Sequence, residues 1–226
     1  AEPRLNFPGI ERRTNGHRYT GEPRSSSGVH CSASQVRRGG EQNPVAHILE
    51  HIFQRRSIRK FTEERVSQES ITQVLQAGMA APSATNRQPW EFVVVTDRKV
   101  LEGLRRVLLL GRYHAPVAIV ICGNMKRALP GPAQGFWIQD CSAATENILL
   151  AATGLGLGTV WIGVHPIGLL AKGVSRTVKL PRHVIPLGVV YLGYPAETKV
   201  PRTQYDQRKV HWQYYGNNTM EESEPT

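Results

Sequence analysis

The sequence predicts a single three-layer domain of the α/β or α+β class, over residues 44–216 of a 226-residue chain. Short apolar runs that suit buried strands alternate with segments whose apolar residues recur at helical spacing. One stretch, from about Gly135 to Thr153, carries apolar or small residues on most helix faces and little charge. A helix of that kind is expected at the centre of a domain, with other layers packed around it.

Two helices are expected in the first part of this domain. The first opens at Pro44, a favoured first helical residue, and has an apolar face made by Val45, Ile48, Leu49, Ile52 and Phe53. The second should begin after an N-cap at Ser67 and stop near Pro82. Its apolar stripe is formed by Ile71, Val74, Leu75 and Met79.

Four strands are expected after these helices. The first, "EFVVVTD" at 91–97, is nearly continuous in β-branched residues, so we expect it to be buried on both faces. The other three are "APVAIVICGN" at 115–124, the end of "GLGLGTVWIGV" at 154–164, and "VIPLGVVYLGYP" at 184–195. Further helices are expected at 97–110, with a basic surface, and at 167–180, before Pro181.

The two ends of the chain differ from this domain in composition. Residues 1–43 are rich in Arg, Gly, Ser and Pro and lack apolar periodicity, so we expect a flexible basic leader without a folded core. Residues 217–226 form an acidic tail that we expect to be loose. The irregular region 196–216 carries several aromatic residues, which predicts that it lies across a surface of its own chain or of a partner.

Composition excludes some classes of protein. The net charge of +10 is compatible with a nucleic acid, an anionic cofactor or merely a basic tail. No apolar run approaches the roughly 20 residues that cross a bilayer, so no membrane association is expected. Cys31, Cys122 and Cys141 are widely spaced, without a CxxC motif or a Cys/His cluster. We therefore expect no bound metal, free buried thiols and a cytoplasmic location.

Several common catalytic motifs are absent. Gly154, Gly156 and Gly158 follow a helix and precede a strand, which is the reverse of the dinucleotide-binding fingerprint, so a helix C-cap and a tight turn are the better interpretation. There is no G-x-S-x-G elbow and no Walker sequence. His47 and His51 lie one helical turn apart, but nothing else supports a metal site there.

Cations and amides remain as candidate binding groups. Arg55, Arg56 and Ser57 follow the first helix and could hold a phosphate through fork-like donors, with Arg59 turned to the same side as Ser57. Asn86 and Gln88 offer donors and acceptors for the edge of a heterocycle, and the backbone of Gly163 can approach a ligand closely. Lys209 is a further cation, within the aromatic region. The alternative for the arginines is a solvated helix end.

The order of these segments resembles the FMN-dependent nitroreductase family, in particular its compact members, over residues 44–216. The resemblance is carried by "RRSIRKF", "APSATNRQPWEFVVV", "APVAIVICGN", "WIQDCSAATENILLAATGLGLGTVWIGVHP", "LPRHVIPLGVVYLGYPAE" and "KVHW". It implies an α+β fold: a three-layer α/β/α sandwich with a mixed, mostly antiparallel sheet. It also implies an intertwined homodimer with FMN at the subunit interface and C-terminal segments that reach across to the partner.

The resemblance also assigns roles to residues. Arg55, Arg56 and Ser57 match positions for the FMN phosphate and ribityl chain, and Arg59 matches a cation near the flavin pyrimidine. The flavin-contacting loop, usually supplied by the other subunit, is matched by Pro82, Ser83, Asn86 and Gln88. The turn that places an N–H at flavin N5 is matched by Trp161, Ile162 and Gly163. Lys209 matches a basic residue that closes over the phosphate, with Arg208 as the fallback.

The activity that the resemblance implies is hydride transfer from NAD(P)H through flavin N5 to nitroaromatics or quinones, in ping-pong turnover. The flavin carries the redox chemistry, so no catalytic side chain is required. Alternatives are an FMN-dependent reductase or reductive dehalogenase of another small aromatic or enone, and a non-enzymatic flavin-binding protein. A nucleic-acid partner is not expected, because the arginines of the leader are not interleaved with aromatic residues.

Overall fold

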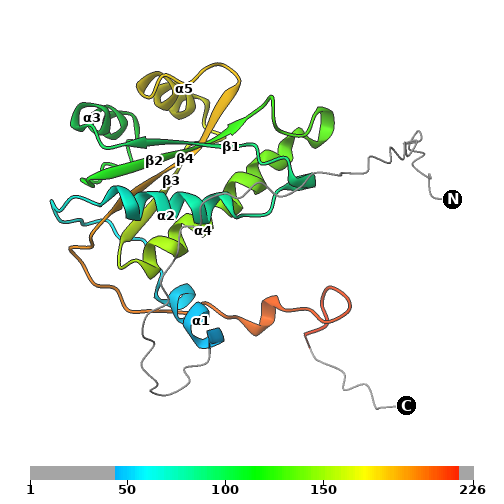
Figure 1. Cartoon of the computed structure of the whole chain (residues 1–226). Helices are drawn as coiled ribbons and strands as arrows, with labels where there is room; N and C mark the ends of the chain where they lie inside the picture. Colours follow the sequence, from blue (N-terminus) through cyan, green and yellow to red (C-terminus); the bar gives the residue numbers. More distant parts are fainter. Residues whose placement is uncertain (1–43, 219–226) are drawn as a thin grey trace, which may run out of the picture. The chain divides into compact units, whose positions relative to one another are not determined.

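The computed structural model describes residues 44–218 and contains one antiparallel sheet of four strands between two layers of helices (Figure 1). This architecture confirms the α+β, three-layer prediction. The expected leader, residues 1–43, lies outside the described residues, and so do residues 219–226 of the predicted tail 217–226. Over the described part of the chain, no helix is both long enough and apolar enough to span a lipid bilayer.

The strands are β1 (Trp90–Val95), β2 (Val117–Asn124), β3 (Gly158–Gly163) and β4 (Val184–Gly193). Their order across the sheet is β1-β2-β4-β3, and each neighbouring pair is antiparallel. Among residues 44–218, a single parallel bridge, between Ser57 and Thr159, lies at the outer edge of β3. The parallel component of the expected mixed sheet is therefore confined to this bridge.

The helices pack on both faces of the sheet (Figure 1). Helices α2 (Gln68–Met79) and α4 (Trp137–Gly154) pair with each other on one face, and α3 (Arg98–Val107) and α5 (Gly168–Thr177) pair on the other. The first helix, α1 (Pro44–Gln54), packs against α4. Short 3-10 turns occur at Ala84–Asn86, Gly131–Phe136 and Gln207–Lys209.

Local chemistry explains where the helices begin and end. The Ser67 hydroxyl accepts a hydrogen bond from the Ser70 N–H and caps α2, as predicted. Asp97 caps α3 through the N–H groups of Lys99 and Val100, both at 2.9 Å. After α4, the turn continues through Gly156, whose φ of +73° is a conformation that glycine adopts without steric cost. This confirms the helix-end interpretation of the glycine-rich stretch.

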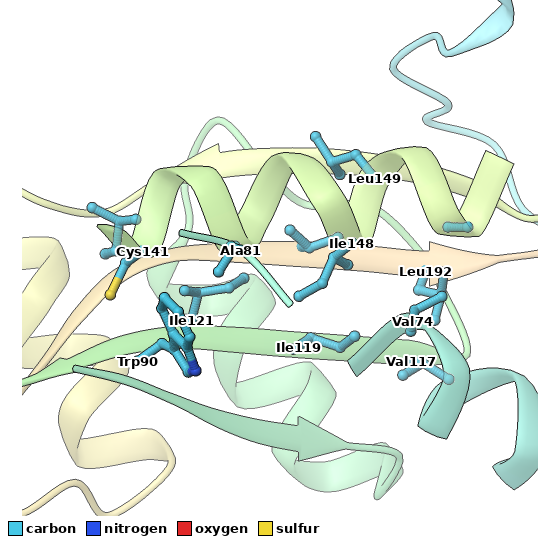
Figure 2. Packing of buried hydrophobic residues seen from close by; sticks show 14 of the residues in the cluster. Val74, Ala81, Trp90, Val117, Ile119, Ile121, Cys141, Ile148, Leu149 and Leu192 are labelled. Atoms are coloured by element: carbon cyan, nitrogen blue, oxygen red, sulfur yellow. The ribbon is translucent and has the colours of Figure 1, made fainter. Parts of the chain in front are cut away.

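The helix α4 occupies the centre of the larger core. Ala144, Ile148 and Ala152 are fully buried on the face that meets the sheet and α2, and Ile148 is seen against Ile119 and Ile121 in Figure 2. Burial of a large apolar side chain such as Ile148 stabilises the fold by roughly 1.5–3 kcal/mol. The nearly uncharged character of this segment is thus explained by burial along most of its length.

The first strand departs from its prediction. Trp90 and Val95 are buried, but the residues between them are only half-buried or exposed, and Val94 is 37% exposed. The expectation of burial on both faces is wrong because β1 is an edge strand of an antiparallel sheet, whose helical layers cover it incompletely. A continuous β-branched run does not reveal whether a strand is central or at an edge.

Two of the three cysteines lie in the described part of the chain, and both are free and buried. Burial raises the pKa of both Cys122 and Cys141 to about 12. These thiols therefore stay protonated near neutral pH and act as small apolar groups, as expected.

We predict that Ile148→Ala lowers the free energy of unfolding by about 3 kcal/mol, because it opens a cavity between α4, α2 and the sheet that tight packing cannot fill. Urea denaturation measures the change. Leu169→Ala is the matched control, since Leu169 is 81% exposed and its truncation removes little buried area. Equal losses in the two variants would contradict the central place of Ile148.

Candidate active site

The arginine-rich segment 55–61 is fixed along the edge of the sheet. The Ile58 N–H donates to the Thr159 carbonyl at 2.8 Å, beside the Ser57–Thr159 bridge. The Ile58 side chain packs on Gly158, where an added Cβ would lie only 2.8 Å from it. The segment is also hydrogen-bonded to the chain that follows β4, through Thr62 N–H and the Tyr194 carbonyl at 3.0 Å. It is therefore an ordered part of the fold rather than a solvated helix end.

Each predicted arginine of this segment has a separate tether. Arg55 Nε lies 3.5 Å from Glu146 Oε1 of α4. The Arg56 guanidinium donates to the Val200 carbonyl. Arg59 Nε donates to the Tyr113 hydroxyl at 3.2 Å, and its guanidinium also donates to the Ser57 carbonyl at 3.4 Å. A guanidinium has five N–H donors, so each of these side chains keeps donors for a ligand.

Two residues beside this segment, Glu197 and Lys199, were not predicted from the sequence. Lys199 Nζ donates to the Ser57 carbonyl at 2.6 Å and lies 3.3 Å from Glu197 Oε1. The same carboxylate oxygen accepts from the Arg59 N–H at 2.5 Å and from the Lys60 N–H at 3.3 Å. These backbone and ammonium donors hold the pKa of Glu197 below its usual value. No sequence signal joins residues so far apart, and both lie in an irregular region.

The predicted loop 82–88 has a defined shape. Ser83 Oγ accepts from the Gln88 N–H at 2.9 Å, and Asn86 Oδ1 accepts from Gln88 Nε2 at 3.0 Å. Thr85, Asn86 and Gln88 all adopt positive φ, between 47° and 55°. Residues other than glycine rarely hold such a backbone unless the surroundings impose it, and functional sites are a common setting. Pro82, Asn86 and Gln88 are exposed.

A buried carboxylate anchors this loop to α4. Asp140 is 6% exposed, and its Oδ1 accepts from the Ala84 N–H at 2.8 Å. Asp140 and Glu146, the partner of Arg55, are six residues apart on the same helix, which corresponds to about 9 Å of rise. The helix thus holds the loop and the arginine segment at different positions along its axis, and no hydrogen bond or ion pair between them occurs within residues 48–218.

The predicted turn 161–163 is the end of strand β3. Trp161 packs with the α2/α4 core, whereas Ile162 packs with the α3/α5 core, because successive side chains of a strand point to opposite faces. The Trp161 indole N–H is buried without a partner among the described residues. Gly163 is exposed, and an added Cβ there would meet nothing within 4 Å. Packing within the chain therefore does not explain the glycine.

The two predicted C-terminal cations lie in the 3-10 turn Gln207–Lys209. The Arg208 guanidinium is bound to the Asp206 carboxylate at 2.9 and 3.0 Å. In the described chain, neither Arg208 nor Lys209 forms a hydrogen bond or ion pair with residues 55–59. Lys199, not Lys209, is the C-terminal cation that contacts Ser57 within one chain.

We predict that Asp140→Ala destabilises the loop 82–88, because the Ala84 N–H loses its acceptor in a site from which water is largely excluded. The expected cost is about 1–3 kcal/mol in urea denaturation, with faster hydrogen exchange at the Ala84 amide. Asp140→Asn keeps a carbonyl oxygen as acceptor, so its free energy of unfolding should fall by less than that of the alanine variant. Unchanged exchange at Ala84 in the alanine variant would show that this bond does not hold the loop.

Comparison with known proteins places this arrangement in a family. The profile of the Nitroreductase family matches residues 52–111 and 110–194. A Methanothermobacter thermautotrophicus protein, provisionally named an NADH dehydrogenase/NAD(P)H nitroreductase, is 45% identical over 73% of this chain and 85% of its own length.

Two further relatives have more specific names. The oxygen-insensitive NADPH nitroreductase of Salmonella typhimurium is 33% identical over 68% of each chain. The structure of an FMN-dependent nitroreductase from Clostridium difficile superimposes with a TM-score of 0.67 at 30% identity, covering 74% of this chain and 99% of that one. The chain described here belongs to the Nitroreductase family, and its relatives from Methanothermobacter thermautotrophicus and Salmonella typhimurium carry the names of NAD(P)H-linked oxidoreductases.

Proposed function

We propose that this protein is an FMN-dependent homodimeric oxidoreductase that takes electrons from NAD(P)H and delivers them to nitroaromatics or quinones, with the two half-reactions alternating at one site. The enzyme class follows from the family. The cofactor is suggested by the FMN-dependent relative from Clostridium difficile. The choice of acceptor is motivated by the nitroreductase names of the relatives.

The outer edge of β3 is the observation that carries the proposal. The cation-rich segment meets this edge at Thr159, and the strand ends at Gly163, four residues further on. At the usual rise of a strand, the two points are about 13 Å apart. An elongated molecule with an anionic end and a flat polar ring system suits such an edge, with cations at one end and open space beside a glycine at the other.

The residues at the cation-rich end fit a phosphate monoester. Arg55 and Arg56 are held by Glu146 and Val200, which fixes their guanidinium groups without using all their donors. Lys199 and Ser57 add an ammonium and a hydroxyl close by. We expect these four side chains to bind the phosphate and the adjoining chain of hydroxyls.

The residues toward the other end fit a heterocycle. When bound, FMN would supply the hydride-accepting and hydride-donating chemistry that the amino acids lack. The Arg59 guanidinium, positioned by the Tyr113 hydroxyl, would stabilise negative charge at the pyrimidine side. The Gly163 backbone leaves room for a close approach, and the Asn86 and Gln88 amides offer polar groups matched to ring edges.

In this proposal, a second copy of the chain supplies the binding groups that do not meet residues 55–59 within one chain. The loop 82–88 and the turn 207–209 make no hydrogen bond or ion pair with residues 55–59 of the same described chain. Apolar side chains are also left uncovered: on α1, Ile48 is 67% exposed and Phe53 is 42% exposed. In the C-terminal region, Tyr214 and Tyr215 are 80% and 93% exposed. Surfaces of this kind favour a partner subunit.

We predict that the purified protein is yellow and oxidises NADH or NADPH when a nitroaromatic or quinone is present. In Arg55→Ala/Arg56→Ala, FMN affinity should fall by about 10- to 100-fold, because charge-assisted bonds to the phosphate are lost. Fluorescence titration with FMN measures this, and Arg182→Ala is the control because Arg182 is exposed and outside the site. A colourless protein that ignores added FMN would refute the cofactor. Flavin binding without NAD(P)H oxidation would favour a non-enzymatic flavin protein.

We predict that two inactive variants complement each other in a mixed dimer. Chain one carries Arg55→Ala/Arg56→Ala, and chain two carries Asn86→Ala/Gln88→Ala. If each site combines 55–59 of one subunit with 82–88 of the other, a heterodimer keeps one intact site and about half of the flavin and activity of the wild-type dimer. Two different affinity tags isolate the heterodimer. If both groups of residues served the same site from one chain, no rescue would occur.

A further inference from the structure

A second cleft, separate from the proposed flavin site, opens at the end of the sheet where β1 ends and β2 begins. Its volume is about 780 Å³, within the range of small-molecule pockets. Its walls come from the segment 62–66, Thr96 with residues of α3 from Arg98 to Arg105, and residues 114–117. None of the residues assigned above to FMN lines it.

Positive charge dominates this cleft. Arg65 lines it from the segment 62–66, Arg98 and Arg105 line it from α3, and Glu63 is the carboxylate among the lining residues. Arg65 and Arg98 are exposed and form no ion pair with any acid of the described chain. The carboxylate of the neighbouring Asp97 accepts hydrogen bonds from the Lys99 and Val100 N–H groups and does not pair with these arginines. Two guanidinium groups are thus available to an anion.

The third arginine is built into the wall. The Arg105 side chain is 16% exposed and is bound to Glu102. A second guanidinium nitrogen of Arg105 lies 2.7 Å from Nδ1 of His114, another lining residue. A guanidinium cannot accept a hydrogen bond, so Nδ1 is the acceptor in this contact. This geometry holds Arg105 in place, and the guanidinium N–H groups that do not contact Glu102 or His114 remain available to a ligand.

A buried hydroxyl next to these groups lacks a partner. Tyr191 of β4 is fully buried, and its hydroxyl has no hydrogen-bond partner among the described residues. Burial raises its pKa to about 12, and the charges of Arg105, Glu102 and Tyr113 also act on it. A buried hydroxyl of this kind usually binds water or a ligand atom.

We infer that this cleft binds a small organic or inorganic polyphosphate, of the size of a pyrophosphate-bearing nucleotide or smaller. Three planar guanidinium forks, one from the segment 62–66 and two from α3, match several phosphate oxygens at once. The hydroxyls of Thr62 and Thr96 add further polar groups to the lining. Apart from His114 no aromatic ring lines the cleft, so it offers no stacking platform for a nucleic acid or for a flat aromatic substrate.

Isothermal titration of the purified full-length protein, with its flavin bound, tests this inference. Tripolyphosphate and pyrophosphate are the probes, and inorganic phosphate is the single-phosphate comparison. We expect one site per chain, weaker binding for inorganic phosphate, and an unchanged visible spectrum because the flavin stays in place. Arg65→Ala and Arg98→Ala should each weaken tripolyphosphate binding about tenfold, and the double variant more.

The controls separate the cleft from other cationic surfaces. Arg182→Ala removes one positive charge at an exposed position outside the cleft, so this variant should bind tripolyphosphate with the affinity of the wild type. Retained flavin colour and circular dichroism verify that the arginine variants are folded. The inference is overturned if no probe binds, if binding releases the flavin, or if Arg65→Ala/Arg98→Ala binds as the wild type does. A chain that purifies without flavin would be titrated in the same way, so the two proposals fail independently.

Discussion

The hydrogen bond from the Ile58 N–H to the Thr159 carbonyl is the contact on which the proposed site depends. It lies at the one parallel bridge of the structure and fixes the register between the arginine segment and β3. Because the Ile58 side chain is buried against Gly158, a shift by one residue would turn a charged side chain toward the core. Hydrophobic burial of one residue thus determines where its charged neighbours Arg56 and Arg59 lie.

The helix α4 supplies the second constraint, since it contacts both parts of the proposed site. Its buried face is apolar, but Asp140 and Glu146 hold the loop 82–88 and Arg55 respectively. Helix geometry separates these carboxylates by about 9 Å along the axis, so each contact holds its group of residues at its own level of α4. This separation supports the proposal that another copy of the chain completes the site.

The sequence predicted most features that depend on local chemistry. The Ser67 cap, the end of α2 before Pro82 and the turn at Gly156 were all expected, because residue type and near neighbours decide them. The edge position of β1 was not predicted, since it depends on the order of strands across the sheet. The roles of Glu197 and Lys199 were also missed, because they contact Arg59 and Ser57 from about 140 residues further along the chain. The Asp206–Arg208 ion pair joins residues only two positions apart, so the local sequence could have predicted it.

The two cationic regions differ in a way that bears on their uses. In the segment 55–59 every arginine has a protein partner, which lowers the entropy lost when a ligand is bound and fixes the positions of the donors. Such an arrangement suits a resident cofactor whose reactive ring must be placed accurately. In the second cleft, only Arg105 is held in this way, whereas Arg65 and Arg98 are exposed and keep all their donors for a ligand. Exposed side chains without a protein partner lose more entropy when they bind a ligand, so an exchangeable polyanion suits that cleft better than a permanent cofactor.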